Sequence, residues 1–136
     1  MSREKSYTSL AASAVLAILT LLVFFVLQHY GPESAVRRFH QAVLNDSARE
    51  LALVTVQTPG DPDVQFLSQM VRDSVRTGAN IRLGRVERER NRAVAEVGYV
   101  YPRGVRVIYW VVERKPAGWM VNGKATTDLF RRMMGI

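Results

Sequence analysis

The sequence predicts an α+β fold, in which one N-terminal transmembrane helix is followed by three helices and four antiparallel strands (α-α-α-β-β-β-β). Three observations predict it: a long apolar run near the N-terminus, apolar residues at helical spacing between positions 33 and 75, and a change to strand-like spacing from Ile81 onward. We expect a cytoplasmic N-terminus at residues 1–8, a transmembrane helix at 9–30, and an extracytoplasmic domain at 31–136, in which helices pack on a curved sheet.

The apolar run extends from Leu10 to Leu27, and two hydroxyl residues are its only polar members. As a helix its 18 residues would extend roughly 27 Å, close to the hydrocarbon thickness of a bilayer. A cleaved signal peptide is the alternative, but such a signal has a shorter core and a small-x-small cleavage site after it. Arg3 and Lys5 precede the run and favour a cytoplasmic N-terminus. We therefore expect a single-pass protein of the bacterial inner membrane with a periplasmic domain.

Small side chains recur on one face of this predicted helix, at Ser9, Ser13, Ala17 and Thr20. Small residues at this spacing allow two helices to approach closely in lipid. The ordinary Ala and Ser content of membrane helices is the other explanation. We expect a helix-docking face, with the lipid bilayer and the subunits of an integral membrane complex as partners.

Three helices are expected after the Gly31-Pro32 boundary. The first covers Glu33 to Leu44, where apolar residues form one stripe. Ser47 and Glu50 form an S-x-x-E capping box that starts the second, which continues through Val54. Asp61 caps the third, Pro62 occupies its first position, and Gly78 closes it.

Four strands follow, separated by short turns that are typical of an antiparallel meander. We expect them at Ile81–Glu89, Arg92–Tyr101, Val105–Lys115 and Trp119–Asn122. The third is apolar on both faces, which predicts a central strand covered on both sides. A short amphipathic segment, Thr127–Met134, closes the chain.

The string GPESAVRRFHQAVLNDSARELALV, together with RVERERNRAVAEVGYVYPRGVRVIYWVVERKPAGWMVNG, resembles the superfamily that includes nuclear transport factor 2 and ketosteroid isomerase. The first string is similar to the opening helix and the following Asp-containing turn of that cone-shaped fold. The second includes a Gly-Trp-hydrophobic-Val-Asn pattern similar to that of its final strand. The resemblance implies a conical pocket between sheet and helices. Members use it for isomerisation, dehydration, ligand binding or protein docking, so the fold leaves the function open.

Few residues offer catalytic chemistry. His40 lies at the edge of the first apolar stripe, where we expect it to be partly exposed, and Asp73 is expected on a solvated face. Glu96 could face either side of the sheet. We carry over no catalytic residue from the superfamily, and the spacing of the residues predicts no metal site and no cofactor. Three aromatic residues could line a pocket: Tyr99, Tyr109 and Trp110.

Positive charge is in excess, with 19 Lys and Arg against 12 Asp and Glu and a net charge of +7. Five arginines crowd the first predicted hairpin: Arg82, Arg85, Arg88, Arg90 and Arg92. Solvated strand faces, with pairing to Glu87 and Glu89, are one explanation. Contact with an acidic partner subunit or with anionic lipid headgroups is another. Nucleic acid is not an expected partner.

These observations favour a non-enzymatic accessory or scaffold subunit of a larger bacterial membrane complex, of the energy-converting or secretion type. A membrane-tethered protein that binds a small apolar ligand is the alternative. A lyase or isomerase of the same fold is a third possibility. The sequence contains no cysteine and therefore no disulfide.

Overall fold

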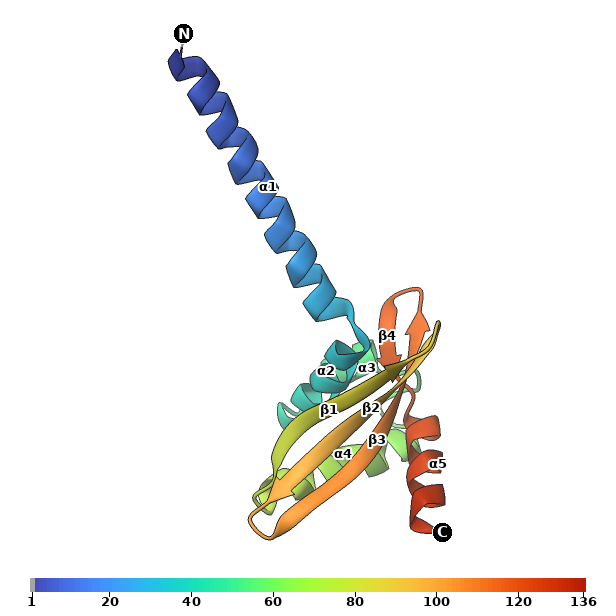
Figure 1. The fold of residues 1–136 in the computed structure, drawn as a ribbon. Helices are drawn as coiled ribbons and strands as arrows, with labels where there is room; N and C mark the ends of the chain where they lie inside the picture. Colours follow the sequence, from blue (N-terminus) through green and yellow to red (C-terminus); the bar gives the residue numbers. More distant parts are fainter. Residues whose placement is uncertain (1) are drawn as a thin grey trace. The chain divides into compact units, whose positions relative to one another are not determined.

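The computed structural model describes the backbone of residues 2–136 and the side chains of residues 8–22 and 31–136. The chain divides into two compact units, Met1–Tyr30 and Gly31–Ile136, and Figure 1 shows the elements of each. The first unit is one helix, α1 (Ser2–Tyr30). Thr8 to Leu22, the described side chains of α1, are all exposed.

The transmembrane part of the predicted fold class requires correction. Among the described residues, none forms a helix that combines the length and the apolar character needed to cross a membrane. Such a helix needs about 20 consecutive, predominantly apolar residues. The predicted membrane location depended on that span. The fold class is corrected to a separate N-terminal helix and an α+β domain.

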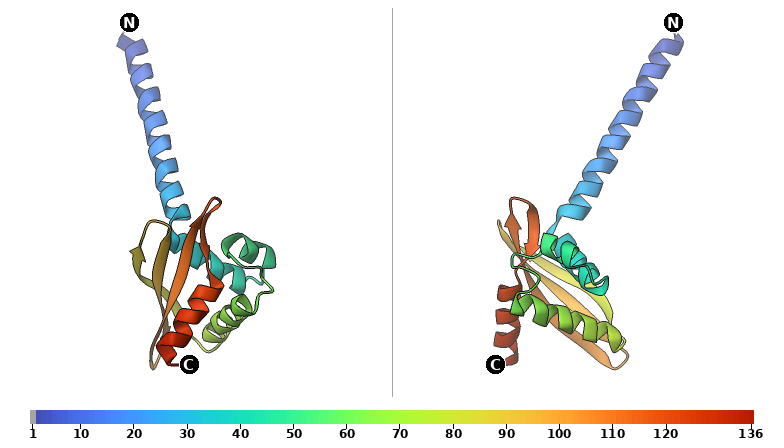
Figure 2. Two further views of the ribbon diagram at one scale, coloured as in Figure 1. Left: turned by 90° about the vertical axis from the view of Figure 1, so that its right-hand side faces the viewer. Right: turned by 180° about the vertical axis from the view of Figure 1, so that it is seen from behind.

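The second unit contains the predicted order of three helices and four strands, followed by a fourth helix. Its elements are α2 (Pro32–Leu44), α3 (Ala48–Val54), α4 (Pro62–Arg76), β1 (Asn80–Arg88), β2 (Arg92–Tyr101), β3 (Gly104–Lys115), β4 (Gly118–Val121) and α5 (Gly123–Met134). The strands form one antiparallel sheet in the order β1-β2-β3-β4. Figure 2 shows α2, α3 and α4 on one face of this sheet.

The helices of the domain begin and end at residues suited to those positions. Ser47 accepts a hydrogen bond from the Glu50 N–H (3.2 Å), as expected of an N-cap residue. The Asp61 carboxylate accepts hydrogen bonds from two backbone N–H groups at the start of α4. Just beyond α4, Gly78 has φ = +96°, a conformation that glycine adopts without strain. The predicted ends of these helices are confirmed within two residues.

The last helix, α5, begins at Gly123 rather than at the predicted Thr127. Asn122 follows β4 and caps α5, because its side-chain oxygen accepts a hydrogen bond from the Ala125 N–H (3.0 Å). The Thr126 hydroxyl in turn accepts a hydrogen bond from the Val111 N–H of β3 (2.9 Å). The start of α5 is therefore held against the part of β3 that β4 does not pair with.

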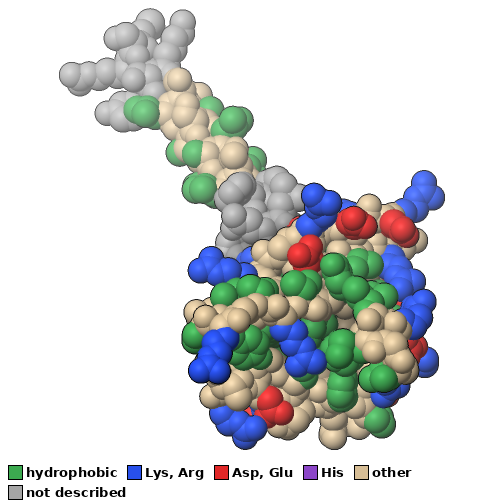
Figure 3. All heavy atoms as spheres, turned by 60° about the horizontal axis from the view of Figure 1, so that its bottom comes forward, with side chains coloured by type: hydrophobic (Ala, Val, Ile, Leu, Met, Phe, Trp, Pro, Cys, Tyr) green, Lys and Arg blue, Asp and Glu red, His purple; other side chains and the backbone are tan. Residues whose placement is uncertain are grey.

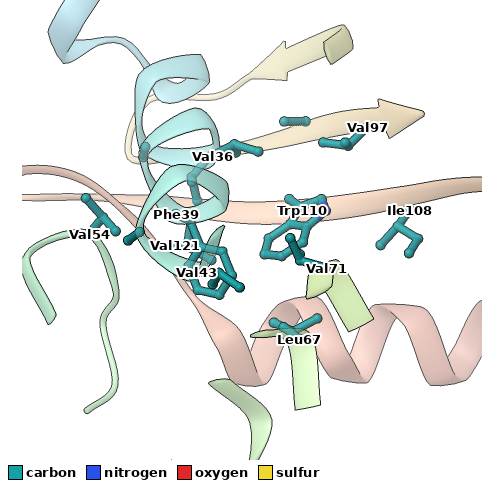
Figure 4. Packing of buried hydrophobic residues seen from close by; sticks show 14 of the residues in the cluster. Val36, Phe39, Val43, Val54, Leu67, Val71, Val97, Ile108, Trp110 and Val121 are labelled. Atoms are coloured by element: carbon teal, nitrogen blue, oxygen red, sulfur yellow. The ribbon is translucent and has the colours of Figure 1, made fainter. Parts of the chain in front are cut away.

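The core lies between α2, α4 and the inner face of the sheet. Along β2 the buried residues are Ala93, Ala95, Val97 and Tyr99, which alternate with half-exposed residues on the outer face. Figure 4 shows Trp110 of β3 among Val36 and Phe39 of α2 and Val71 of α4. All four side chains are buried, and the Trp110 and Phe39 ring centroids lie 4.9 Å apart. The interior between sheet and helices is thus filled with side chains.

Candidate functional site

The five predicted arginines lie on β1 and in the turn that joins β1 to β2. Arg82, Arg85 and Arg88 belong to β1, which is an edge strand of the sheet. Arg90 lies in the turn and Arg92 begins β2. The turn is tight, since the Glu89 N–H donates to the Arg92 carbonyl (2.8 Å). This hairpin concentrates all five guanidinium groups at one margin of the sheet, which we call the arginine edge.

The arginines of this edge lack ion-pair partners within the described part of the chain. The ion pairs of the domain join other residues: Arg72–Asp46, Arg76–Asp73, Lys115–Glu113 and Lys124–Asp128. Pairing with Glu87 and Glu89, one of the two explanations weighed for the cluster, is therefore not observed. Arg88 instead lies over the Trp119 ring, with its guanidinium carbon 5.3 Å from the ring centroid. All five side chains are exposed.

A β-bulge shapes the middle of the arginine edge. The pairing between β1 and β2 shifts by one residue between Leu83 and Val86, so Gly84 and Arg85 lie opposite the single residue Glu96. A Cβ added at Gly84 would lie 3.3 Å from the Glu96 carbonyl oxygen. Gly84 therefore provides room for Glu96, which is half-buried on the outer face of the sheet.

His40 occupies the interior and is buried, contrary to the expectation of partial exposure. Its Nδ1 lies 2.7 Å from the Val36 carbonyl oxygen, and its Nε2 lies 2.7 Å from the Tyr99 hydroxyl. A carbonyl only accepts, so Nδ1 carries the hydrogen and donates it, while Nε2 accepts the Tyr99 O–H. Both ring nitrogens are therefore hydrogen-bonded: Nδ1 within α2, and Nε2 to Tyr99 of β2.

Burial sets the protonation of this pair. Desolvation lowers the pKa of His40 to about 4, against the opposing effect of the hydrogen bond to the Val36 carbonyl. Desolvation also raises the pKa of Tyr99 above its ordinary value. Both groups are neutral near pH 7. Neither is free to move a proton to or from a bound molecule without losing a buried hydrogen bond.

The three aromatic residues predicted to line a pocket do not lie together. Tyr99 and Trp110 are fully buried on the inner face of the sheet, where Trp110 packs on His40 with ring centroids 4.7 Å apart. Tyr109 lies on the outer face and is half-buried, since it is opposite Glu96 in the sheet. Asp73, the other predicted base, lies on α4 with 45% of its side chain exposed, and it pairs with Arg76.

Cavities lie around the filled core rather than inside it. One of about 410 Å³ lies between α2, α3 and α4, and one of about 380 Å³ lies between α4 and the β2–β3 hairpin. A third, of about 340 Å³, lies between α2 and the strands β1 and β2. We call it the α2–β1 groove. Within the described residues, no group of three His, Cys, Asp or Glu side chains is placed to hold a metal ion.

The sequence does not indicate that the residues lining the α2–β1 groove lie together. Its lining is mostly apolar: Val36, Leu44, Ile81, Leu83 and Val97, with His40, Arg37 and Gln41 as the polar members. The alternation Ile81-Arg82-Leu83 marks a strand with one apolar face, but it does not indicate which helix lies beside that face. The groove depends on the packing of α2 next to β1, which a local pattern does not specify.

The predicted docking face on α1 lies within the described side chains. Ser9, Ser13, Ala17 and Thr20 are all helical and exposed. The Thr20 hydroxyl donates to the Leu16 carbonyl (2.8 Å), so its polar group is used within its own helix. A docking role for this face stays a prediction.

No family model matches the sequence, and no curated protein matches it. Among solved structures, the chain is similar to a protein from Campylobacter jejuni that is provisionally named an NTF2-like transpeptidase. The match has a TM-score of 0.47 and 13% sequence identity, and it covers 68% of this chain and 97% of the other. At this level the similarity carries no argument about activity. The arrangement of residues 31–136, three helices followed by a four-stranded meander, is established by their own elements.

Proposed function

We propose that residues 31–136 form a non-enzymatic docking module, an accessory subunit that binds an acidic surface of a partner protein. The observation that carries the proposal is the arginine edge: five exposed guanidinium groups on β1, its turn and the start of β2, none of which forms an ion pair among the described residues. Guanidinium groups pair with carboxylates through two parallel hydrogen bonds. An acidic partner surface would supply carboxylates for the arginines of this edge to pair with.

The state of the two candidate bases supports a role without catalysis. His40 uses both ring nitrogens inside the core, and the Asp73 carboxylate is exposed and already paired with Arg76. A general base must lie within hydrogen-bond reach of the proton that it removes from a substrate. The interior around Trp110 is packed, and where His40 lines the α2–β1 groove both of its ring nitrogens are already hydrogen-bonded.

The net charge of +7 gives further support, and Figure 3 shows Lys and Arg side chains at the margin and centre of one face, with fewer Asp and Glu side chains among them. A surface of one dominant sign attracts a partner of the opposite sign and speeds its association. The arginine edge would then determine where on the domain that partner binds.

The proposal can be tested with two charge-reversal variants of the full-length chain. The first, R82E/R85E/R90E, changes the arginine edge and spares Arg88, which contacts Trp119. The second, R38E/R49E/R103E, makes the same change in charge at exposed arginines elsewhere on the domain. Each is purified at low salt from the cells that naturally produce the chain, and bound partners are identified by native mass spectrometry.

We expect the wild type and the R38E/R49E/R103E variant to retain the same acidic partner, and the edge variant to lose it. Equal thermal unfolding of the two variants shows that folding is not the cause. Equal retention by both variants contradicts the proposal. So does a wild-type chain that carries no partner at low salt.

A further inference from the structure

The two edges of the sheet differ in whether other segments of the domain form hydrogen bonds with them. At the β4 edge, the Val56 N–H donates to the Val121 carbonyl (2.9 Å), and Thr55 forms a parallel bridge with the same residue. The Asn122 N–H donates to the Val111 carbonyl, and the Val111 N–H donates to the Thr126 hydroxyl. At the β1 edge, no described segment of the domain pairs with the strand. Figure 1 shows β1 as the outermost strand on that side.

The register identifies which backbone groups face outward from β1. In the hairpin the Arg92 carbonyl accepts a hydrogen bond from Glu89, so the backbone N–H and C=O groups of the even-numbered residues of β2 point toward β1. Beyond the bulge, Arg82 is opposite Gly98 and Asn80 is opposite Val100. The backbone N–H and C=O groups of Arg82 and Asn80 thus point toward β2 and are hydrogen-bonded within the sheet. By the alternation of an antiparallel ladder, Ile81 and Leu83 turn their N–H and C=O groups toward the open edge.

The side chains beside these outward groups differ between the two faces. Ile81 and Leu83 line the α2–β1 groove on the inner face, opposite Leu44 of α2. Arg82 projects from the outer face, and Arg85 lies next to it in the bulge. Glu87 and Glu96 are the acidic residues near them on that face, and no ion pair joins either one to these arginines among the described residues. One strand edge therefore offers open backbone groups, an apolar groove and positive charge.

We propose that β1 accepts an extended acidic segment of the partner protein as an additional strand. The segment bonds to the outward backbone groups of Ile81 and Leu83. Its alternate side chains are apolar and enter the α2–β1 groove, and the intervening ones are acidic and meet Arg82 and Arg85. This inference rests on the proposed docking function, and it adds the mode of binding and the chemistry of the bound segment.

Charge distinguishes this occupant from a second copy of the chain. Pairing two β1 edges in a register centred on Arg82, where the α2–β1 groove lies, would bring the arginines of the two copies together, and like charges across a strand pair are unfavourable. An acidic strand meets the same arginines favourably, so one set of charges both repels a second copy and attracts the partner. The apolar groove and the outward N–H and C=O groups favour a peptide over a nucleic acid.

A peptide of alternating glutamate and valine is the defined probe, and the full-length chain is the target. Two N-methylated forms of this peptide remove the N–H groups of either all valines or all glutamates, without altering the protein. In an antiparallel arrangement the valines face the groove and their N–H groups point to β1, whereas in a parallel arrangement the glutamate N–H groups do so. We expect one form to lose about tenfold or more in affinity and the other to bind like the parent peptide.

Two further measurements locate the site. Binding should slow hydrogen exchange at the Ile81 and Leu83 amides, which face outward in the free domain. Leu44→Asp, in the wall of the groove, should weaken binding, whereas Leu53→Asp on α3 should not. These leucines are 45% and 57% exposed, so both variants are expected to fold.

The outcomes separate the two proposals. If both N-methylated forms bind like the parent peptide while the R82E/R85E/R90E variant still loses it, charge alone holds the peptide; strand addition is then overturned and the docking function stands. Absence of binding by the parent peptide, or a stronger response to a single-stranded oligonucleotide, also overturns strand addition. The docking function itself is decided by the partner retained from cells.

Discussion

At the scale of single residues, His40 shows how a polar group can serve the core. The imidazole bonds to the Val36 carbonyl within α2 and links α2 to β2 through the Tyr99 hydroxyl, each at 2.7 Å. A buried polar group is tolerated when its hydrogen bonds are made, and it is costly when one is lost. His40 therefore helps to fix the position of α2 on the sheet, and its stabilising effect depends on its remaining neutral.

The stability of the domain should consequently fall in mild acid. The pKa of His40 is about 4 in the folded protein, against 6.5 for the exposed side chain. Below pH 6.5 the unfolded chain binds the proton first, so stability is lost as the pH falls from about 6.5 to about 4. The loss should approach roughly 3 kcal/mol at the lower limit. Urea unfolding at a series of pH values measures it.

His40→Gln supplies the comparison for this prediction, because an amide keeps a donor and an acceptor but does not titrate in this range. We expect the decline between pH 6.5 and 4 to be much smaller in this variant. His29→Gln, which changes the only other histidine, should retain the full decline. An unchanged decline in His40→Gln contradicts the assignment.

Tyr99→Phe should destabilise the domain although it removes only one oxygen atom. The change leaves the His40 Nε2 buried without its donor, and such a loss costs about 1–3 kcal/mol. Tyr101→Phe on the same strand is the control, because the Tyr101 side chain is half-exposed. Denaturant unfolding of the two variants at pH 7 measures the difference, and equal stability of both contradicts the role given to the Tyr99 hydroxyl.

At the scale of elements, Asn122 joins four segments of the domain. Its side-chain oxygen accepts hydrogen bonds from the Ala125 N–H of α5 and from the Gln57 amide in the loop after α3. Its own amide donates to Glu113 of β3 (2.8 Å) and, as the main cause, holds the pKa of that carboxyl below its ordinary value. The Asn of the Gly-Trp-Met-Val-Asn string is thus a structural joint between sheet and helices.

Asn122→Ala should lower the free energy of unfolding by about 1–2 kcal/mol, since α5 loses its cap. It should also raise the pKa of Glu113, because the amide that stabilises the carboxylate is absent. NMR titration measures the pKa, and thermal unfolding measures the stability. Asn122→Ser separates the two effects: a serine can cap the helix but cannot donate an amide hydrogen to Glu113. An unmoved Glu113 pKa in both variants contradicts the assignment.

The elements show which parts of the fold a sequence can predict. Ser47, Asp61 and Gly78 determine helix ends through their own side chain or backbone, and their helices were predicted closely. The start of α5 was missed because Asn122 was assigned to the fourth strand, although its side chain caps α5 through the nearby Ala125 N–H. The burial of His40 has no such local signal, because its hydrogen-bond partner Tyr99 is 59 positions away.

The candidate site likewise has a part that the sequence predicts and a part that it does not. The arginine edge is visible in the sequence because its five members lie within one hairpin. The groove beside it is not visible, because it forms between Leu44 of α2 and two residues of β1, Ile81 and Leu83. The Gly84 bulge likewise depends on the alignment of β1 with Glu96 of β2. Local patterns thus predicted the charge of the site but not its shape.

At the scale of the whole molecule, the net charge of +7 and the open β1 edge bear on association with other copies. An edge strand without charged side chains is a template for pairing with another chain, and charged residues on such strands prevent it. Besides the proposed attraction of an acidic partner, we therefore expect Arg82 and Arg85 to have a second effect, which is to keep copies of the domain from pairing through β1.

Replacing these two arginines with valine should promote self-association of the full-length chain. R82V/R85V removes the repulsion and raises the β-propensity of the edge, whereas R38V/R49V makes the same change in charge on α2 and α3, away from the sheet edge. Sedimentation velocity at several protein concentrations should show larger species for R82V/R85V than for R38V/R49V or the wild type. High salt should move the wild type toward the edge variant, because it screens exposed charges. If R38V/R49V associates as strongly as R82V/R85V, loss of net charge is the cause, and the edge arginines have no special part in keeping copies apart.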